Sequence, residues 1–251
     1  MAKQRHLTNA PITEALISFQ VRQDLEQFSA RHEQFVARVG PGYYRKGDIR
    51  QGTFQIAVTD GEESLEDGIR ADSKRVGVRL HSQDEKYVIQ VTHAGLTLSR
   101  LEPYEKWTII RDEMRRLWEI YRGVFLPEMI ARVALRYLNT ILIVVGPQTR
   151  LEQIFTRAPT EPEGMSDQLS SFLNRCVIED PPTRASIVVT LASQTAVPSS
   201  TLPVVLDIEA IRQADFPVDG EEVWNYLESL RDLKNTAFFG SLTEDKVRQY
   251  E

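Results

Sequence analysis

The sequence predicts an α+β fold in which antiparallel sheets carry flanking helices. Short segments alternate polar and apolar residues, and turn-length stretches join them as in β-hairpins. Helix-period segments stand at a few points between these strands and do not follow every strand. No GxGxxG sequence follows an early strand, so nothing indicates a doubly wound dinucleotide-binding sheet.

The first half of the chain carries most of the alternating segments. Residues 15–22 place one apolar set on one side of a half-buried strand, namely Ala15, Ile17, Phe19 and Val21. The same alternation predicts strands at 53–59, 75–81, 87–93 and 96–101, with a tight turn at 93–95. We expect a meander of antiparallel strands that leaves one sheet face polar.

Two helices are predicted among these strands. After a candidate N-cap at Asp24, apolar residues recur at helical spacing until Gly40. A longer helix is expected to open at Pro103 and to end at Pro127. Its apolar stripe is Trp107, Ile110, Met114, Leu117, Tyr121 and Phe125.

The second half repeats this order more loosely. A long strand is expected at 129–145, then a short helix near 149–157 and a polar connector at 158–166. Further strands are expected near 172–179, 184–193 and 202–210. A helix near 219–235 and a short helix beginning at Thr243 would end the chain.

This order divides the chain into an N-terminal α+β half, residues 1–127, and a C-terminal α+β half, residues 128–251. Each half is expected to run strand, helix, three or four antiparallel strands and helix, an order close to β-α-β-β-β-α that suggests a structural duplication. The alternative is one continuous domain whose single sheet happens to alternate in this way.

Composition limits the class of protein. The 251 residues are 41% hydrophobic and 26% charged, as in an ordinary globular protein, and no apolar run reaches the length of a membrane helix. The first residues lack the apolar core of a secretory signal, so a cytoplasmic location is expected. The single cysteine excludes an internal disulfide. A net charge of −6 does not favour general nucleic-acid binding.

Three stretches carry a resemblance to a known family. They are LTNAPITEALISFQV, KYVIQVTHAGLTLSRLEPYEKW and RVALRYLNTI, in this order. With their APIxEA and RxALRYxN motifs they resemble a sporadically distributed bacterial protein family with no assigned activity. The resemblance covers the chain to about residue 160. It implies a shared fold and an accessory genetic locus, such as a defence or toxin–antitoxin locus, and it supplies no catalytic residues.

The first candidate binding residues lie on the polar sides of predicted strands. Arg132 and Arg136 share one strand face, about 13 Å apart, and Glu14 could pair with either if the two strands are neighbours. A structural ion pair is the favoured interpretation of these residues, and a ligand-binding arginine or a catalytic role are the alternatives. Polar residues expected beside them on the same sheet face are Gln20, Arg22, Gln55, Arg79 and Gln90.

The second candidate is a basic and aromatic cluster formed by Tyr43, Tyr44, Arg45, Lys46 and Arg50, which runs into a polar stretch at 47–51 that is expected to be a loop. Aromatic rings beside basic groups suit base stacking and phosphate pairing. An exposed loop with its aromatic rings tucked beneath it is the simpler interpretation.

Searches for catalytic chemistry find little. There is no phosphate-binding loop, nucleophile elbow or zinc motif, so we expect no catalytic residue, no cofactor and no metal site. His81 and His93 could meet at the ends of adjacent strands. Asp207 and Glu209 could hold a divalent metal together with Glu179 or Asp180, but such pairs are common on exposed strands.

Two function classes remain. The favoured one is a non-catalytic binding protein that uses a polar sheet face, or a cleft between the halves, to hold a protein partner or another copy of itself. The alternative is an enzyme that acts on nucleic acid or a nucleotide with scattered arginine and acidic groups. No membrane partner is expected.

Overall fold

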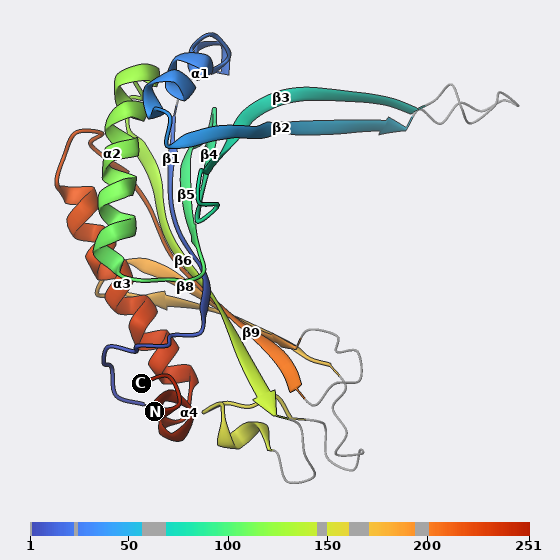
Figure 1. The fold of residues 1–251 in the computed structure, drawn as a ribbon, viewed down its shortest axis with the longest axis vertical. Coiled ribbons are helices and arrows are strands. Elements are labelled where there is room, and N and C mark those ends of the chain that lie inside the picture. The colour runs from blue at the N-terminus through green and yellow to red at the C-terminus, as the bar shows by residue number, and fades with distance from the viewer. Residues whose placement is uncertain (1, 23–24, 57–68, 145–149, 161–170, 194–200) are drawn as a thin grey trace, which may run out of the picture.

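A single antiparallel sheet of nine strands organises the molecule, and the helices lie along one side of it (Figure 1). The structure is a computed structural model that describes residues 2–22, 25–56, 69–144, 150–160, 171–193 and 201–251. For residues 25–29, 51–56 and 69–74 only the backbone is considered. The α+β class predicted from the sequence is confirmed.

The elements follow the chain in the order strand, helix, four strands, helix, strand, short turn, three strands and two helices. Their bounds are β1 Ile12–Val21, α1 Leu25–Val39, β2 Tyr43–Ile56, β3 Ile69–Ser82, β4 Tyr87–Thr92, β5 Gly95–Leu101, α2 Trp107–Phe125, β6 Ile130–Val144, the 3-10 turn η1 Leu151–Gln153, β7 Leu173–Asp180, β8 Ala185–Ser193, β9 Thr201–Phe216, α3 Glu222–Ser241 and α4 Glu244–Arg248. No helix within the described part of the chain is long and apolar enough to cross a membrane.

The sheet has the strand order β2-β3-β4-β5-β1-β6-β9-β8-β7. The two segments with the strongest sequence motifs, β1 and β6, are therefore neighbours at its centre. In each half the first strand pairs with the last strand of the same half, β1 with β5 and β6 with β9. The halves join through the antiparallel β1–β6 pair. A duplication remains a hypothesis, and the second half has the turn η1 where the first has α1.

Period-2 alternation builds the core. Phe19 on β1 is fully buried, and its ring lies 5.2 Å from the ring of Trp118 on α2 and 5.4 Å from that of Trp224 on α3. All six residues of the predicted α2 stripe are buried. Burying large side chains of this kind is worth about 1.5–3 kcal/mol each, and edge-to-face rings add to it. The apolar side of β1 therefore fixes which face of the sheet receives the helices.

Several predicted boundaries are wrong. The long helix begins at Trp107 and not at Pro103, because the backbone of Lys106 is still extended; before it, the carbonyl of Pro103 accepts a hydrogen bond from Arg100. Residues 47–51 belong to β2 and form no loop. The helix predicted near 149–157 is only the turn η1, although part of that range lies outside the described residues, as does part of the connector at 158–166.

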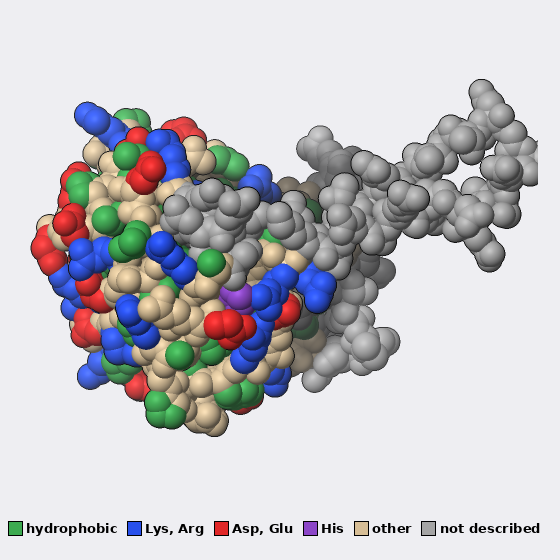
Figure 2. All heavy atoms as spheres, turned by 90° about the horizontal axis from the view of Figure 1, so that it is seen from above, with side chains coloured by type: hydrophobic (Ala, Val, Ile, Leu, Met, Phe, Trp, Pro, Cys, Tyr) green, Lys and Arg blue, Asp and Glu red, His purple; other side chains and the backbone are tan. Residues whose placement is uncertain are grey.

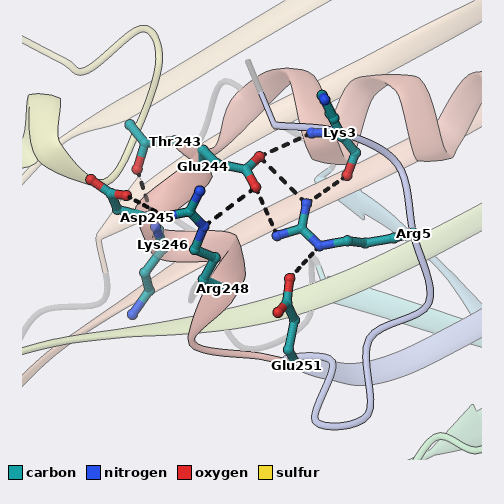
Figure 3. Close-up of polar contacts among 8 residues, drawn as sticks. All are labelled: Lys3, Arg5, Thr243, Glu244, Asp245, Lys246, Arg248 and Glu251. Atoms are coloured by element: carbon teal, nitrogen blue, oxygen red, sulfur yellow. Dashed lines mark hydrogen bonds and ion pairs between the residues drawn. The ribbon is translucent and has the colours of Figure 1, made fainter.

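The two ends of the chain lie together beside α4 (Figure 1). Arg5 forms ion pairs with Glu244 and with Glu251, and the backbone N–H of Lys3 donates to Glu244 (Figure 3). The hydroxyl of Thr243 accepts a hydrogen bond from the backbone N–H of Lys246, so the predicted N-cap of α4 is confirmed. These contacts hold the N-terminal segment against the helical side of the molecule.

Candidate functional site

Helices α2 and α3 lie along one side of the sheet (Figure 1), and the strand pairing places the polar residues of the central strands on the opposite side. Residues that are opposite each other in antiparallel strands share a face, and the pairing of Ser18 with Thr97 and with Ala134 carries this face across the centre of the sheet. We call this side the helix-free face. Its described polar residues include Ser18, Gln20, Arg79, Gln90, Thr97, Arg132, Arg136, Thr190, Asp207 and Glu209.

Two ion pairs stand at the centre of the helix-free face. Arg136 binds Asp207 through two bonds, from Nε to Oδ1 at 2.8 Å and from Nη2 to Oδ2 at 2.6 Å. Arg132 Nη2 lies 2.8 Å from Glu209 Oε1. The hydrogen bond from Arg136 to the Asp207 carboxylate raises the pKa of the guanidinium above its usual range. Both arginines are thereby held in place and neutralised by acidic groups of β9.

The register of β6 and β9 explains these pairs. Glu209 lies directly opposite Arg136, and Asp207 lies opposite Leu138, so each arginine can reach a carboxylate along the neighbouring strand. The expected cross-strand bond from Glu14 to Arg132 or Arg136 is not the one that forms. Glu14 lies opposite Leu138 and Leu101, and it acts on Arg136 only as a nearby charge. Carboxylates of β9, and not Glu14 of β1, therefore form the ion pairs with the two arginines.

The other two arginine candidates lie toward different borders of this face. Arg22 follows the end of β1, is exposed, and forms an ion pair with Asp215 at 3.1 Å. Arg79 on β3 is also exposed, opposite Gln90 of β4. Within the described residues Arg79 has no ion-pair or hydrogen-bond partner. Its guanidinium is therefore open to a molecule that approaches the face. The side chain of Gln55 lies outside the described residues.

Tyr43, Tyr44 and Arg45 do not form a single cluster. They lie on β2, where alternation separates them. Tyr43 turns to the helical side and donates a hydrogen bond to Glu113 of α2 at 2.8 Å. Arg45 pairs with Glu33 of α1 at 2.7 Å and with Asp48. Tyr44 is opposite His81 and donates to Glu85. Their contacts are structural, and no stacking platform is built from them.

The other possible groupings of chemical groups also separate. His81 lies on β3, whereas His93 follows β4 and bonds through its backbone to Val76, near the other end of that strand pair. Asp207 is engaged by Arg136. Asp180 accepts hydrogen bonds from Thr183, and Glu179 accepts one from Ser186. Within the residues that the structure describes, no group of three or more histidine, cysteine or acidic residues could hold a metal ion.

The helix-free face is balanced in charge and partly apolar. Among the described residues that strand pairing places on this face, the arginines Arg79, Arg132, Arg136 and Arg175 are matched by the acidic residues Glu14, Glu179, Asp207 and Glu209. Acidic and basic side chains are also mixed over the end of the molecule that carries α1 (Figure 2). Large apolar side chains are also exposed on this face, namely Leu142 and Val144 at the end of β6 and Leu173 and Val177 on the edge strand β7.

A second site, on the helical side, escaped the sequence analysis. A cavity of about 790 Å³ lies between α3, the beginning of α2, β6 and the N-terminal segment, and Lys234 is among the residues that line it. The sequence contains a pattern that could have revealed the buried lysine. Lys234 continues the apolar stripe of Val223, Leu227 and Leu230 at helical spacing, so a lysine stands where the pattern demands a buried residue.

Comparison with known proteins does not assign the chain to a family. No protein-family model matches the chain, and no curated protein matches it.

Proposed function

We propose that this chain is a non-catalytic binding protein that holds a protein partner on the helix-free face of its sheet. The observation that carries this proposal is the pair of ordered, internally neutralised arginines, Arg132 and Arg136, on a sheet face that no described helix covers. Ion pairs of this kind give a surface a fixed shape and a fixed pattern of charge, which favours specific recognition.

A protein suits this face better than a nucleic acid. Nucleic-acid binding draws on an excess of basic groups that pair with phosphates, and the described charges of the face are balanced. Exposed apolar side chains on this face, including Leu142 and Val144 at the end of β6, add the kind of contact surface that proteins bury on association. We further propose that the complex belongs to an accessory bacterial locus and forms in the cytoplasm, as expected from the sequence.

One observation supports the alternative, an enzyme acting on nucleic acid or a nucleotide. Strands β2 and β3 together contain seven basic and two acidic residues, a net charge of +5 in a chain whose total is −6. A basic pair of strands can bind phosphates although the whole protein is acidic. The acidic groups near Arg136 and Arg132 are engaged in ion pairs, so the support for this alternative is limited to binding.

Matched surface variants test the proposal. The double variant Gln20→Arg with Gln90→Arg adds two charges and bulk to the helix-free face. The control, Gln34→Arg with Asn225→Arg, makes the same change at exposed positions of α1 and α3. Each chain is tagged, expressed in its native host and purified, and its fold is checked by circular dichroism.

We expect a protein to co-purify with the wild-type chain and with the control, and to be lost from the double variant of the face. Equal recovery of the partner with both double variants would contradict the proposal. Recovery of nucleic acid with all chains, together with turnover of a nucleotide substrate that Arg136→Gln abolishes, would favour the alternative instead.

A further inference from the structure

The cavity on the helical side contains a lysine in an unusual position. Lys234 is only 9% exposed, and its Nζ lies 3.9 Å from the centre of the Tyr137 ring. Within the described residues its ammonium group has no hydrogen bond and no carboxylate partner. Burying a cation without a paired anion is costly, because the surroundings solvate its charge less well than bulk water does. It lines a space large enough for a small molecule.

Glu228, one of the acidic residues that line the cavity, is already engaged by other groups. Glu228 accepts hydrogen bonds from Trp107 Nε1 at 2.7 Å and from Arg111 at 2.9 Å, and Arg231 lies 3.6 Å from its other oxygen. Glu228 therefore cannot serve as a free counter-ion for Lys234. From adjacent turns of α3 the cavity receives two cationic side chains, Arg231 and Lys234, and of these only Arg231 is paired with Glu228.

We propose that this cavity binds a small oxo acid, a molecule with an aldehyde or ketone carbon close to an acid group, through reversible iminium formation at Lys234. The acid group lies against Arg231, and the carbonyl carbon lies against Nζ. This site lies on the opposite side of the sheet from the helix-free face, so it is independent of the binding function proposed above.

The covalent step needs no other reactant. The lone pair of the neutral amine forms a bond to the carbonyl carbon, and the carbon–oxygen π electrons move to the oxygen. That oxygen takes one proton from the nitrogen and one from solvent and leaves as water, which produces a protonated carbon–nitrogen double bond. Addition of water reverses the sequence and restores Lys234 and the free oxo acid, with no change in oxidation state.

The surroundings keep the amine neutral enough to react. Burial, and then the charge of Arg231, lower the pKa of Lys234 to about 7. The titratable and charged groups that face the cavity are Glu228, Arg231 and Asp232 of α3, Tyr137 of β6, Tyr104, Glu105, Lys106 and Arg111 around the start of α2, and Arg5 and His6 of the N-terminal segment. Burial beside a second cationic group is a known way to activate a lysine.

The cavity also has groups that can orient a ligand and a wall that encloses it. The hydroxyls of Tyr104 and Tyr137 lie 3.0 Å apart on its lining, so one of them keeps a proton that it can donate. The N-terminal segment forms the outer wall. Its Arg5 is fixed to Glu244 and Glu251, next to α4 (Figure 3). These contacts keep the wall in place while the ligand is bound.

Reductive trapping tests the proposal. The intact protein is treated at pH 7 with glyoxylate and cyanoborohydride, which fixes an iminium as a stable amine, and each lysine is quantified by peptide mass spectrometry. Lys106, which is exposed at the same cavity, is the internal reference. A lysine with a pKa near 7 has a neutral fraction larger by roughly a thousandfold than an ordinary lysine, so even with hindered access we expect about tenfold faster labelling of Lys234.

Two further comparisons test which chemical groups of the ligand are needed. Glycolaldehyde has the carbonyl but lacks the acid, so it should label Lys234 more slowly relative to Lys106, and Arg231→Gln should remove the difference between the two probes. Lys234→Met should abolish the fast labelling. If that variant does not fold, the comparison of the two lysines in the wild-type protein remains decisive. Labelling of Lys234 no faster than Lys106 overturns the proposal, and equal labelling by both probes overturns the role of Arg231.

Discussion

At the scale of single residues, Lys234 is in the environment least suited to its charge. The side chain completes an apolar helix stripe, and its stem packs where leucine or phenylalanine would be expected. The ring of Tyr137 offers a cation–π contact in place of a carboxylate. Such a contact offsets only part of the cost of burying an ammonium group, so protonation of Lys234 should oppose folding.

This cost predicts a pH dependence of stability. The pKa of Lys234 is about 7 in the folded chain and 10.5 when unperturbed, so the unfolded chain binds the extra proton between these values. Stability should therefore rise with pH from about 7 to about 10, by up to about 1.4 kcal/mol per pH unit. Urea unfolding of wild type and Lys234→Met across this range isolates the effect. The control is the variant of an exposed lysine, Lys106→Met, whose difference in stability from wild type should not change with pH. A difference between wild type and Lys234→Met that is likewise independent of pH would contradict the prediction.

Arg136 raises the complementary question of whether an arginine is a structural residue or a free ligand group. Its two bonds to Asp207 join half-buried side chains, so the pair should be worth about 1 kcal/mol, near the upper end for exposed ion pairs. A double-mutant cycle with Arg136→Met and Asp207→Leu, measured by urea unfolding, gives the coupling energy. Coupling close to zero would mean that Asp207 does not hold Arg136, which would then be free to bind a ligand.

At the scale of elements, the centre of the sheet depends on a close approach between β1 and β5. Gly95 begins β5 with φ of +144°, a conformation that residues with a Cβ rarely adopt. A Cβ at this position would also run into the backbone oxygen of Phe19. Gly95 thus lets the β4–β5 hairpin pair closely with β1.

Substitution of this glycine should be costly. Gly95→Ala combines backbone strain with a clash against backbone atoms that cannot move aside, and we expect a loss of about 3 kcal/mol or more. Gly42→Ala is the matched control, because a Cβ there has no atom within 4 Å and φ is not positive. Thermal unfolding of both variants distinguishes them, and similar melting temperatures would show that the β1–β5 approach tolerates a side chain.

The strands and the helical stripes could be predicted because alternation and helical spacing are local patterns. Residues Ala15, Ile17 and Phe19 face the core as their parity indicates, and Met114 does so on α2. The polar beginning of β2 resembled a loop because it lies at the edge of the sheet, where no apolar face is demanded. A polar edge strand and a polar loop have the same composition.

The candidate site was predictable only in part. The parity of Arg132 and Arg136 was visible in the sequence, but their partners depend on which strand lies next to β6. Because β6 has two neighbours, Glu14 on β1 and Asp207 on β9 were both available, and only the tertiary register decides between them. Lys234 was visible as an irregular residue in a stripe, whereas the cavity around it is formed by segments distant in sequence.

At the scale of the whole molecule, one sheet separates two surfaces. The helical side contains the hydrophobic core and the cavity of Lys234, and the other side presents the polar residues of the central strands. The two central strands, β1 and β6, contribute to both sides, because alternate residues face opposite ways. A partner bound on one side and a small ligand bound on the other would therefore contact the same two strands.

The central claim is that the helix-free face is the binding surface, and site-specific photo-crosslinking tests it most directly. A benzophenone side chain is placed at position 90 on the helix-free face, and in a separate chain at position 34 on α1, and each chain is irradiated in its native host. The account predicts a covalent adduct with one partner protein from position 90 and none from position 34. An adduct from position 34 alone, or equal adducts from both positions, would contradict it.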